Sequence, residues 1–261
     1  MADEVLLQLE DAVGTIILNR PEHGNAIDAA LADGLMRAID RLASEPRVRA
    51  VLITGAGTKF CLGGDIDGMK AAGEALAQNM ERDLPPLHDA MLKLASLPVP
   101  IISAVNGSVG GGGLSIALCA DLVLAAESMK LRGGYSAIGL TPDLGASWFL
   151  VQRAGATCAR QILFLNRVLT AGECLSCGLV DAVYPDERLP VEARTLASQL
   201  AAGATLSLGR IKRLIAGASS RSLAEHLDIE REYMIASGRS HDGMEGVAAF
   251  LEKRPPNFLG R

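Results

Sequence analysis

Two glycine-rich turns are the first segments of the sequence whose residue types could do chemistry. Residues 59–66 read KFCLGGDI and residues 106–113 read NGSVGGGG, and each follows an apolar run. Glycine permits positive φ and a close approach of the backbone to a ligand, so N–H groups can be aimed at one acceptor. Either turn alone could simply be tight. At the ends of two neighbouring parallel strands, the pair could supply two N–H donors to one oxygen, which is an oxyanion hole.

A phosphate-binding loop is the rival interpretation of glycines that follow a strand. The sequence contains no G-x-G-x-x-G with an acid about 20 residues further on, and no GK[ST]. Both nucleotide-binding motifs are therefore absent, and the oxyanion hole is the favoured interpretation of the two turns.

The five cysteines are odd in number and sit in a long chain, so they do not form a disulfide framework. Cys174 and Cys177 make a C-x-x-C pair, but no second Cys/His pair lies nearby. A structural zinc site needs four ligands. We therefore expect neither a metal nor a redox role for this pair.

The overall composition excludes several kinds of partner. The 261 residues carry a net charge of −5 and contain no basic cluster, so neither nucleic acid nor a membrane surface is an expected partner. The first residues are acidic, and no apolar run approaches the roughly 18 residues of a membrane span. We expect a cytoplasmic protein with a sizeable core, since 49% of the residues are apolar.

The elements that must position the glycine turns alternate along the first two-thirds of the chain. Strand patterns fall at residues 5–11, 14–21, 49–57, 101–107 and 121–128, and a helical pattern falls at 28–44. Strands separated by helices predict parallel βαβ units with right-handed crossovers. Residues 68–95 are expected to be helical in their second half, with Pro85-Pro86 at the start of that helix.

The pattern changes near residue 189, after which all signals are helical. We therefore predict a core at residues 1–188 that carries the site and a helical C-terminal region at 189–261. The helices of this region have apolar stripes that would be exposed if the region stood alone. Such stripes indicate packing on the core or on another subunit.

Several motifs, spaced across essentially the whole chain, resemble the signature blocks of the crotonase (enoyl-CoA hydratase/isomerase) superfamily. The blocks are Asn19-Arg20-Pro21 with Asn25-Ala26, Phe60-Cys61-x-Gly63-Gly64-Asp65, Asn106-Gly107 with the glycines that follow, Gly139-Leu140-x-Pro142, Ala171 with Gly178-Leu179-Val180, and Phe250-x-x-Lys253-Arg254. The resemblance implies an α/β fold, the crotonase (ClpP-like) spiral of ββα units with a helical C-terminal trimerisation region. It also implies an acyl-CoA substrate, self-association as a homotrimer or a dimer of trimers, and neither a metal nor any cofactor besides the CoA of the substrate.

By position, the resemblance assigns the thioester oxygen to the backbone N–H groups of Gly64 and Gly112. Asp65 is expected beside the substrate as a turn and capping residue rather than as a catalyst. Lys253 resembles a residue that reaches the CoA phosphates from a neighbouring subunit, and a solvated lysine on a terminal helix is the alternative. The other residues expected to contact substrate or CoA are Asn25, Ala26, Gly63, Ile66, Gly111, Ser115, Tyr135 and Phe250.

The general acid and base decide which reaction of the superfamily is catalysed. Hydratases place one Glu in the helix after the glycine run and a second Glu in the segment that follows. Ser115 and Tyr135 occupy these two positions here. Neither can act as a carboxylate base at neutral pH, because a Ser hydroxyl is barely acidic and Tyr titrates near about 10. The usual two-carboxylate hydration is therefore not expected.

Asp143 is the remaining candidate base, although it could simply cap a helix that begins near Gly145. Two subgroups of the superfamily carry a catalytic Asp at this place. In the epoxyphenylacetyl-CoA isomerases of phenylacetate degradation the Asp moves a proton, and in the 4-chlorobenzoyl-CoA dehalogenases it attacks the aromatic ring. His88 lies where the dehalogenases carry a His that activates water, and a capping or solvated role is its alternative.

The C-terminal third looks closely like the isomerase subgroup, in stretches such as Leu227-Asp228-x-Glu230-Arg231-x-Tyr233 and Gly238-Arg239-Ser240. We therefore predict an enoyl-CoA isomerase in which Asp143 shifts a double bond of the acyl group. Three alternatives stay open: an enoyl-CoA hydratase with atypical catalytic residues, a dehalogenase-like hydrolase of 4-halobenzoyl-CoA, and an acyl-CoA-binding protein without turnover.

Overall fold

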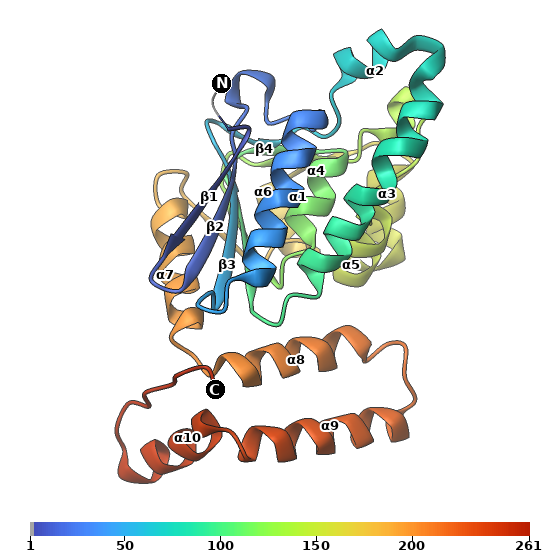
Figure 1. Cartoon of the computed structure of the whole chain (residues 1–261). Coiled ribbons are helices and arrows are strands. Elements are labelled where there is room, and N and C mark those ends of the chain that lie inside the picture. The colour runs from blue at the N-terminus through green and yellow to red at the C-terminus, as the bar shows by residue number, and fades with distance from the viewer. Residues whose placement is uncertain (1–2) are drawn as a thin grey trace.

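The computed structural model describes residues 3–261, and in this range a six-stranded sheet lies at the centre of the fold (Figure 1). Its order is β1 (Val5–Glu10), β2 (Val13–Leu18), β3 (Ala50–Gly55), β5 (Ile101–Val105), β7 (Leu122–Ala126) and β10 (Ala182–Tyr184). β1 and β2 are antiparallel, and the other neighbouring strands run parallel. β5 is buried at every residue, as expected for a parallel strand covered on both faces.

The glycine-rich turns contribute strands to a second sheet. Its order is β4 (Lys59–Cys61), β6 (Ser108–Gly110), β8 (Lys130–Arg132) and β9 (Val168–Thr170). β4, β6 and β8 run parallel, and β9 is antiparallel to β8. The two turns therefore do more than connect a strand to the next helix. Because β4 pairs with β6, the glycines that follow these strands are brought side by side.

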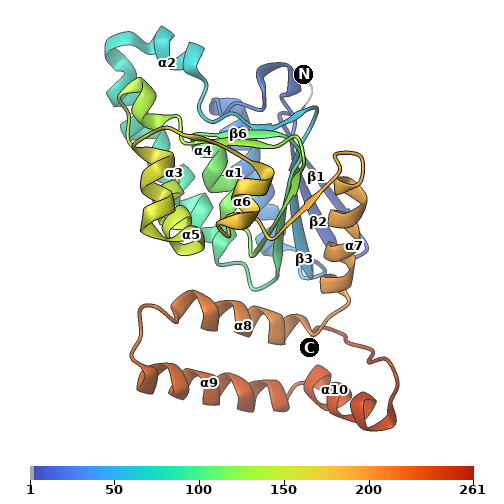
Figure 2. The same cartoon turned by 180° about the vertical axis from the view of Figure 1, so that it is seen from behind.

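Helices cover both faces of the central sheet (Figures 1 and 2). α1 (Ala29–Ser44) packs on β1 and β2, and α3 (Leu76–Ala95) packs on α1. α7 (Leu189–Ala201) packs on the opposite face, over β3 and β5. The remaining helices of the core are α2 (Ile66–Ala72), α4 (Gly112–Leu118), α5 (Ala146–Leu163) and α6 (Ala171–Ser176).

α1 shows how the sequence pattern becomes packing. Its buried residues include Leu31, Leu35, Ile39 and Leu42, which recur at helical spacing and so form one face. Asp28 caps the helix, because its side chain accepts a hydrogen bond from the N–H of Leu31. The helix predicted over residues 28–44 is thereby confirmed.

One local prediction about α3 is wrong. Pro85 and Pro86 lie in the middle of this helix and not at its start, because helical structure begins at Leu76. A proline inside a helix leaves the carbonyl four residues earlier without its N–H partner. Both prolines and the residues that carry these carbonyls, Glu81 and Arg82, are exposed, so water can bond the carbonyls instead.

The last three helices form a layer apart from the core (Figure 1). They are α8 (Thr205–Gly217), α9 (Leu223–Gly238) and α10 (His241–Glu252). α8 lies at the amino-terminal ends of the parallel strands. Arg49, which precedes β3, donates hydrogen bonds to the carbonyl of Gly203 and to Oγ1 of Thr205 at 2.6 and 2.8 Å. Lys212 of α8 lies 2.9 Å from the carboxylate of Asp121, which precedes β7.

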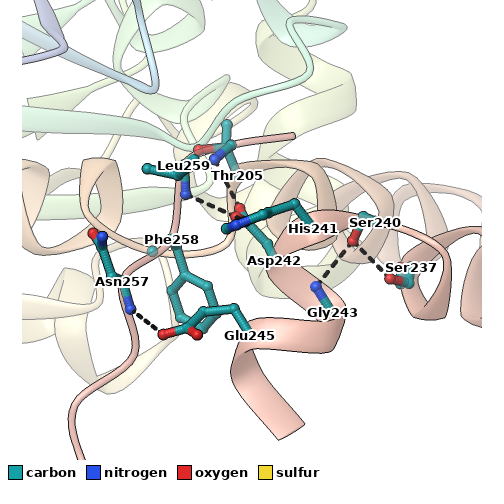
Figure 3. A network of polar contacts seen from close by, with 12 residues as sticks. Thr205, Ser237, Ser240, His241, Asp242, Gly243, Glu245, Asn257, Phe258 and Leu259 are labelled. Atoms are coloured by element: carbon teal, nitrogen blue, oxygen red, sulfur yellow. Dashed lines mark hydrogen bonds and ion pairs between the residues drawn. The ribbon is translucent and has the colours of Figure 1, made fainter. Parts of the chain in front are cut away.

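The chain end is folded back onto α10 by two carboxylates (Figure 3). Asp242 is buried and accepts hydrogen bonds from the N–H groups of Leu259 and Gly260 at 2.7 and 2.8 Å. Burial alone would raise the pKa of Asp242, but these hydrogen bonds outweigh it and hold the pKa below its usual range. Glu245 accepts from the N–H of Asn257 at 2.8 Å, so residues 257–260 follow the helix surface.

Candidate active site

The two glycine turns meet at the carboxyl ends of the central strands. A Cβ on Gly63 would lie only 2.9 Å from the carbonyl oxygen of Gly110 and 3.2 Å from the nitrogen of Gly112. Gly63 and Gly111 also have positive φ values of 97° and 49°. Only glycine satisfies both constraints, so the sequence permits a contact between backbones that any side chain would block.

The N–H groups of Gly64 and Gly112 are the donors that this contact leaves available. Within residues 3–261, neither donates a hydrogen bond, whereas their neighbours Gly111 and Asp65 donate to the carbonyls of Gly133 and Ile27 at 3.1 Å each. Gly112 is buried and is the first residue of α4, where helical N–H groups have no partner within the helix. Two adjacent unpaired N–H groups are the geometry of an oxyanion hole.

Asp143 lies beside this pair. Its Oδ1 atom would be 3.8 Å from a Cβ on Gly112, so the carboxylate borders the same space as the Gly112 N–H. The Tyr135 hydroxyl donates a hydrogen bond to Oδ1 of Asp143 at 2.7 Å. Ser115 is fully buried, and its hydroxyl donates to the main-chain carbonyl of Asp143 at 3.1 Å. Ser115 and Tyr135 occupy the two positions at which hydratases carry Glu, and both therefore hold Asp143 in place.

Tyr135 is a hydrogen-bond donor here and not an acid. Burial raises the pKa of its hydroxyl far above the ordinary value, and the charge of Asp143 and the hydrogen bond to it add to the effect. The tyrosine is therefore protonated throughout the range in which enzymes work. Oδ1 of Asp143 accepts from this donor, and no group within residues 3–261 donates a hydrogen bond to Oδ2.

The helix-cap interpretation of Asp143 is wrong. α5 begins at Ala146 with Gly145 as its N-cap, at φ 91°, and no side chain caps it. The main-chain carbonyl of Asp143 accepts from the Ala146 N–H at 2.9 Å, which leaves the carboxylate free to face the site. Leu144 has a φ of 50°, a strained value for a side chain of this size. Strain next to a carboxylate that caps no helix favours a functional interpretation of this loop.

His88 of α3 lies against the same loop. Its Nε2 atom accepts a hydrogen bond from the N–H of Leu144 at 3.3 Å. The structure therefore brings His88 next to the residue that follows Asp143, while the rest of this exposed residue is in contact with solvent.

Asn25 supports the site without facing it. Its side chain is fully buried, accepts from the N–H of Arg20 at 2.8 Å, and donates to the carbonyls of Ala56 and Lys59 at 3.0 and 2.8 Å. All of its hydrogen bonds are thus made to the backbone of the surrounding loops. The carbonyl of Ala26 accepts from the guanidinium of Arg20 at 2.7 Å, and its N–H donates to the carbonyl of His23 at 3.1 Å. The small methyl group is therefore the part of Ala26 that is left to line a groove.

Asp65 caps α2, as predicted, since its carboxylate accepts from the N–H groups of Asp67 and Gly68. Ile66 is largely exposed at the mouth of the site. No motif or spacing in the sequence pointed to Ile27. Its Cδ1 atom would be 3.1 Å from a Cβ on Gly112, so this side chain borders the space beside the Gly112 N–H. Its only hint was its position directly after the Asn25-Ala26 motif.

Phe250 and Lys253 are not brought to this site within the chain. Phe250 is 83% exposed on α10, and Lys253 is the exposed C-cap of that helix. Both belong to the layer at the amino-terminal ends of the strands, whereas Gly64 and Gly112 lie at the carboxyl ends. Any contact of these two residues with a substrate must therefore be with the substrate of another subunit.

Comparison with known proteins agrees with this geometry. The enoyl-CoA hydratase/isomerase family matches residues 8–261, so the chain belongs to that family. It is 38% identical to 1,2-epoxyphenylacetyl-CoA isomerase of Escherichia coli K12 over the whole of both chains. It is 30% identical to trans-2-decenoyl-acyl-carrier-protein isomerase of Streptococcus mutans, over 99% of this chain and 98% of that protein.

A solved structure shows the same fold. The enoyl-CoA hydratase from Polaromonas sp. JS666 superimposes with a TM-score of 0.92 at 32% identity, covering 98% of this chain and 99% of that one. The predicted crotonase fold is thereby confirmed. Because isomerases and a hydratase resemble the chain to similar degrees, the comparisons establish the family and leave the reaction to the residues of the site. No helix within residues 3–261 is both long and apolar enough to span a bilayer.

Proposed function

We propose that the protein is an enoyl-CoA isomerase that shifts a double bond of its acyl group by proton transfer through Asp143. The observation that carries this proposal is the position of Asp143, whose carboxylate borders the Gly112 N–H and accepts a hydrogen bond from Tyr135. An isomerisation needs one group that both removes and returns a proton. A hydration of the usual kind needs a second carboxylate, and the two hydratase positions hold Ser115 and Tyr135 instead.

In the proposed mechanism the thioester oxygen accepts hydrogen bonds from the N–H groups of Gly64 and Gly112. These donors stabilise the negative charge that develops when a proton is lost from the α-carbon, or from the γ-carbon of a conjugated acyl group. Asp143 removes that proton and returns it two carbons along the chain, so the double bond moves and the carboxylate is regenerated. A positioned base contributes typically about 10²–10⁴-fold to such a step.

Tyr135 and Ser115 hold Asp143 ready for this reaction. The tyrosine hydroxyl binds Oδ1, and Ser115 binds the main-chain carbonyl, so both the side chain and the backbone of Asp143 have defined positions. A base that is held in place needs less reorganisation when the proton moves. Ser115 and Tyr135, which replace the two carboxylates of a hydratase, therefore contribute to the proposed isomerisation by positioning Asp143.

The proposal is tested by incubating the protein in D₂O with 3-enoyl-CoA, 2-enoyl-CoA and 4-halobenzoyl-CoA and measuring product masses. We expect a product from 3-enoyl-CoA that has gained only exchanged deuterium. A product heavier by one water from 2-enoyl-CoA at a comparable rate would identify a hydratase and overturn the proposal.

Hydrolytic dehalogenation is the second candidate, because one specific observation favours it. His88 accepts a hydrogen bond from Leu144, so an imidazole lies beside the loop that carries Asp143. In that reaction Asp143 would attack the aromatic ring and expel halide, and His88 would activate the water that releases the product. Steady-state halide release from 4-halobenzoyl-CoA that falls to about one equivalent per active site in His88→Gln would establish this alternative.

We further propose that the chain self-associates through its C-terminal layer, as a homotrimer or a dimer of trimers. α9 contains no buried residue, and α8, α9 and α10 expose large apolar side chains that include Ile215, Leu223, Met234, Phe250 and Leu251. An apolar surface of this extent is typical of a subunit interface. In such an assembly Lys253 and Phe250 would lie near the CoA group bound by a neighbouring subunit.

A further inference from the structure

Three cysteines gather beside the kink of α5, away from the candidate active site. Cys158 lies on the part of α5 that follows Gly155, and Cys174 and Cys177 lie on and directly after α6. The Sγ atoms of Cys158 and Cys177 are 3.5 Å apart. The fold therefore creates a pair of thiols between two helices that the C-x-x-C pattern of the sequence does not contain.

The surroundings distinguish these three thiols. Cys174 is fully buried, and burial raises its pKa to about 12, which makes it unreactive. Cys158 and Cys177 are partly exposed and line an open cleft of about 700 Å³, together with Arg167 and Glu173. A small oxidant can therefore reach this pair, while the protein shields the third cysteine.

We propose that Cys158 and Cys177 are a modification site, at which a reversible disulfide forms by exchange with a low-molecular-weight disulfide of the glutathione class. This differs from the expectation from the sequence, where Cys174 and Cys177 were the pair considered and no redox role was expected. The separation of 3.5 Å must shrink to about 2.05 Å, which rotation about the two Cα–Cβ bonds and a small helix shift can supply.

The exchange proceeds in two balanced steps. The Cys177 thiolate attacks oxidised glutathione, forms a mixed disulfide and releases one glutathione thiolate. The Cys158 thiol then loses its proton to solvent, attacks Sγ of Cys177 and expels the second glutathione. Two protein thiols are oxidised to one disulfide, and one glutathione disulfide is reduced to two thiols.

The state of Cys158 agrees with this order. Its thiol donates a hydrogen bond to Sγ of Cys177. Burial and this hydrogen bond raise the pKa of Cys158 to about 11, so Cys158 is protonated in the resting protein. It becomes the attacking group only in the second step, where its neighbour holds the disulfide within reach.

The backbone at the kink can absorb the movement. Gly155 interrupts α5 with a φ of 75° and a ψ of 165°, and a Cβ built there would meet no atom within 4 Å. The segment that carries Cys158 is thus joined to the first part of α5 by a glycine with open space around it. A shift of this segment toward α6 leaves the part of α5 that follows Asp143 in place.

The test is to treat the fully reduced, folded protein with oxidised glutathione in the absence of air, block remaining thiols, and measure the intact and tryptic masses. Trypsin cleaves after Arg153, Arg160, Arg167 and Arg188, which places Cys158 in residues 154–160 and the other two cysteines in residues 168–188. We expect a protein lighter by two hydrogen atoms, with these two peptides linked, and complete reversal by dithiothreitol.

Variants identify the sulfurs that are joined. Cys174→Ala should keep the cross-link, whereas Cys158→Ser should lose it and retain one glutathione on Cys177. The proposal is overturned if the unmodified protein keeps a stable glutathione adduct, if its mass does not change, or if the bond forms within residues 168–188. Because the unmodified protein alone decides between these outcomes, a variant that fails to fold leaves the test valid.

Discussion

The two ends of the parallel strands differ in whether the groups gathered there find partners within the same chain. At the carboxyl ends, Gly63 and Gly112 lie in backbone contact, and the buried side chains of Asn25 and Ser115 have hydrogen-bond partners in the same chain. At the amino-terminal ends, α8 is attached through polar contacts of Arg49 and Lys212. The layer formed by α8, α9 and α10 leaves its large apolar side chains on the surface.

This difference shows which parts of the structure a single chain can form without a second subunit. The proposed oxyanion hole is made of backbone groups, so the pairing of β4 with β6 is enough to bring its parts together. An apolar helix face is complete only when another surface covers it. We therefore expect changes at the carboxyl ends to act on turnover, and changes in the C-terminal layer to act on assembly and on substrate affinity.

The largest effect is expected for Asp143→Asn. Asparagine keeps the size of the side chain and removes the base, so we expect turnover to fall by about 10³-fold or more while acyl-CoA binding is retained. Steady-state kinetics with 3-enoyl-CoA and a binding titration measure the two quantities. Asp65→Asn is the matched control, because Asp65 caps α2 and asparagine caps equally well. Normal turnover in Asp143→Asn would refute the assignment of the base.

The next effect is expected for Gly112→Pro. Proline removes the N–H donor, and as the first residue of α4 it stands at the helical position that tolerates it best. We expect turnover to fall by about 10²–10³-fold on any thioester substrate. Gly112→Ala is the control, since alanine keeps the N–H and its Cβ meets the side-chain ends of Ile27 and Leu144 at 3.1 and 3.2 Å and Oδ1 of Asp143 at an ordinary contact distance of 3.8 Å. Circular dichroism must show both variants folded, and equal activity of the two would exclude an oxyanion hole at this residue.

A smaller effect is expected for Tyr135→Phe. The hydroxyl donates a hydrogen bond to Oδ1 of Asp143, so its removal leaves this carboxylate less firmly positioned. The loss of one hydrogen bond corresponds to about tenfold, so we expect kcat to fall by about this factor with little change in KM in steady-state kinetics.

Because burial raises the pKa of Tyr135, the unmodified protein should show no loss of activity from tyrosine ionisation below about pH 10. Tyr184→Phe, a change on β10 at a distance from the site, is the matched control for the variant. An unchanged kcat in Tyr135→Phe would mean that this hydrogen bond is not made in the working enzyme.

The smallest effect on chemistry is expected in the C-terminal layer. Leu227→Glu combined with Met234→Glu places two charges on the exposed apolar side chains of α9. We expect the assembly to dissociate to monomers in size-exclusion chromatography with light scattering. We also expect KM for acyl-CoA to rise by about tenfold or less, with a smaller change in kcat. Glu232→Gln on the same helix is the control. A monomeric unmodified protein would disprove the proposed interface.

Much of the fold could be predicted because it depends on local patterns. The apolar runs of β3, β5 and β7 and the helical spacing in α1 are properties of neighbouring residues, and the glycines require a close approach whatever lies opposite them. The prolines of α3 were misplaced because a local rule for helix starts was applied to a helix whose exposed face tolerates the lost bonds.

The sequence by itself therefore determined the strands β1, β2, β3, β5 and β7, the helix α1 and the helical character of the C-terminal region. It also determined which turns must be glycine and which hydratase carboxylates are absent. Only the tertiary structure decided which side chains meet. The hydrogen bond from Tyr135 to Asp143, the contact of His88 with Leu144, and the Cys158–Cys177 pair join residues on different elements. Their distances depend on how those elements pack, and no local pattern contains that information, because periodicity records which face of an element is apolar and not what lies against it.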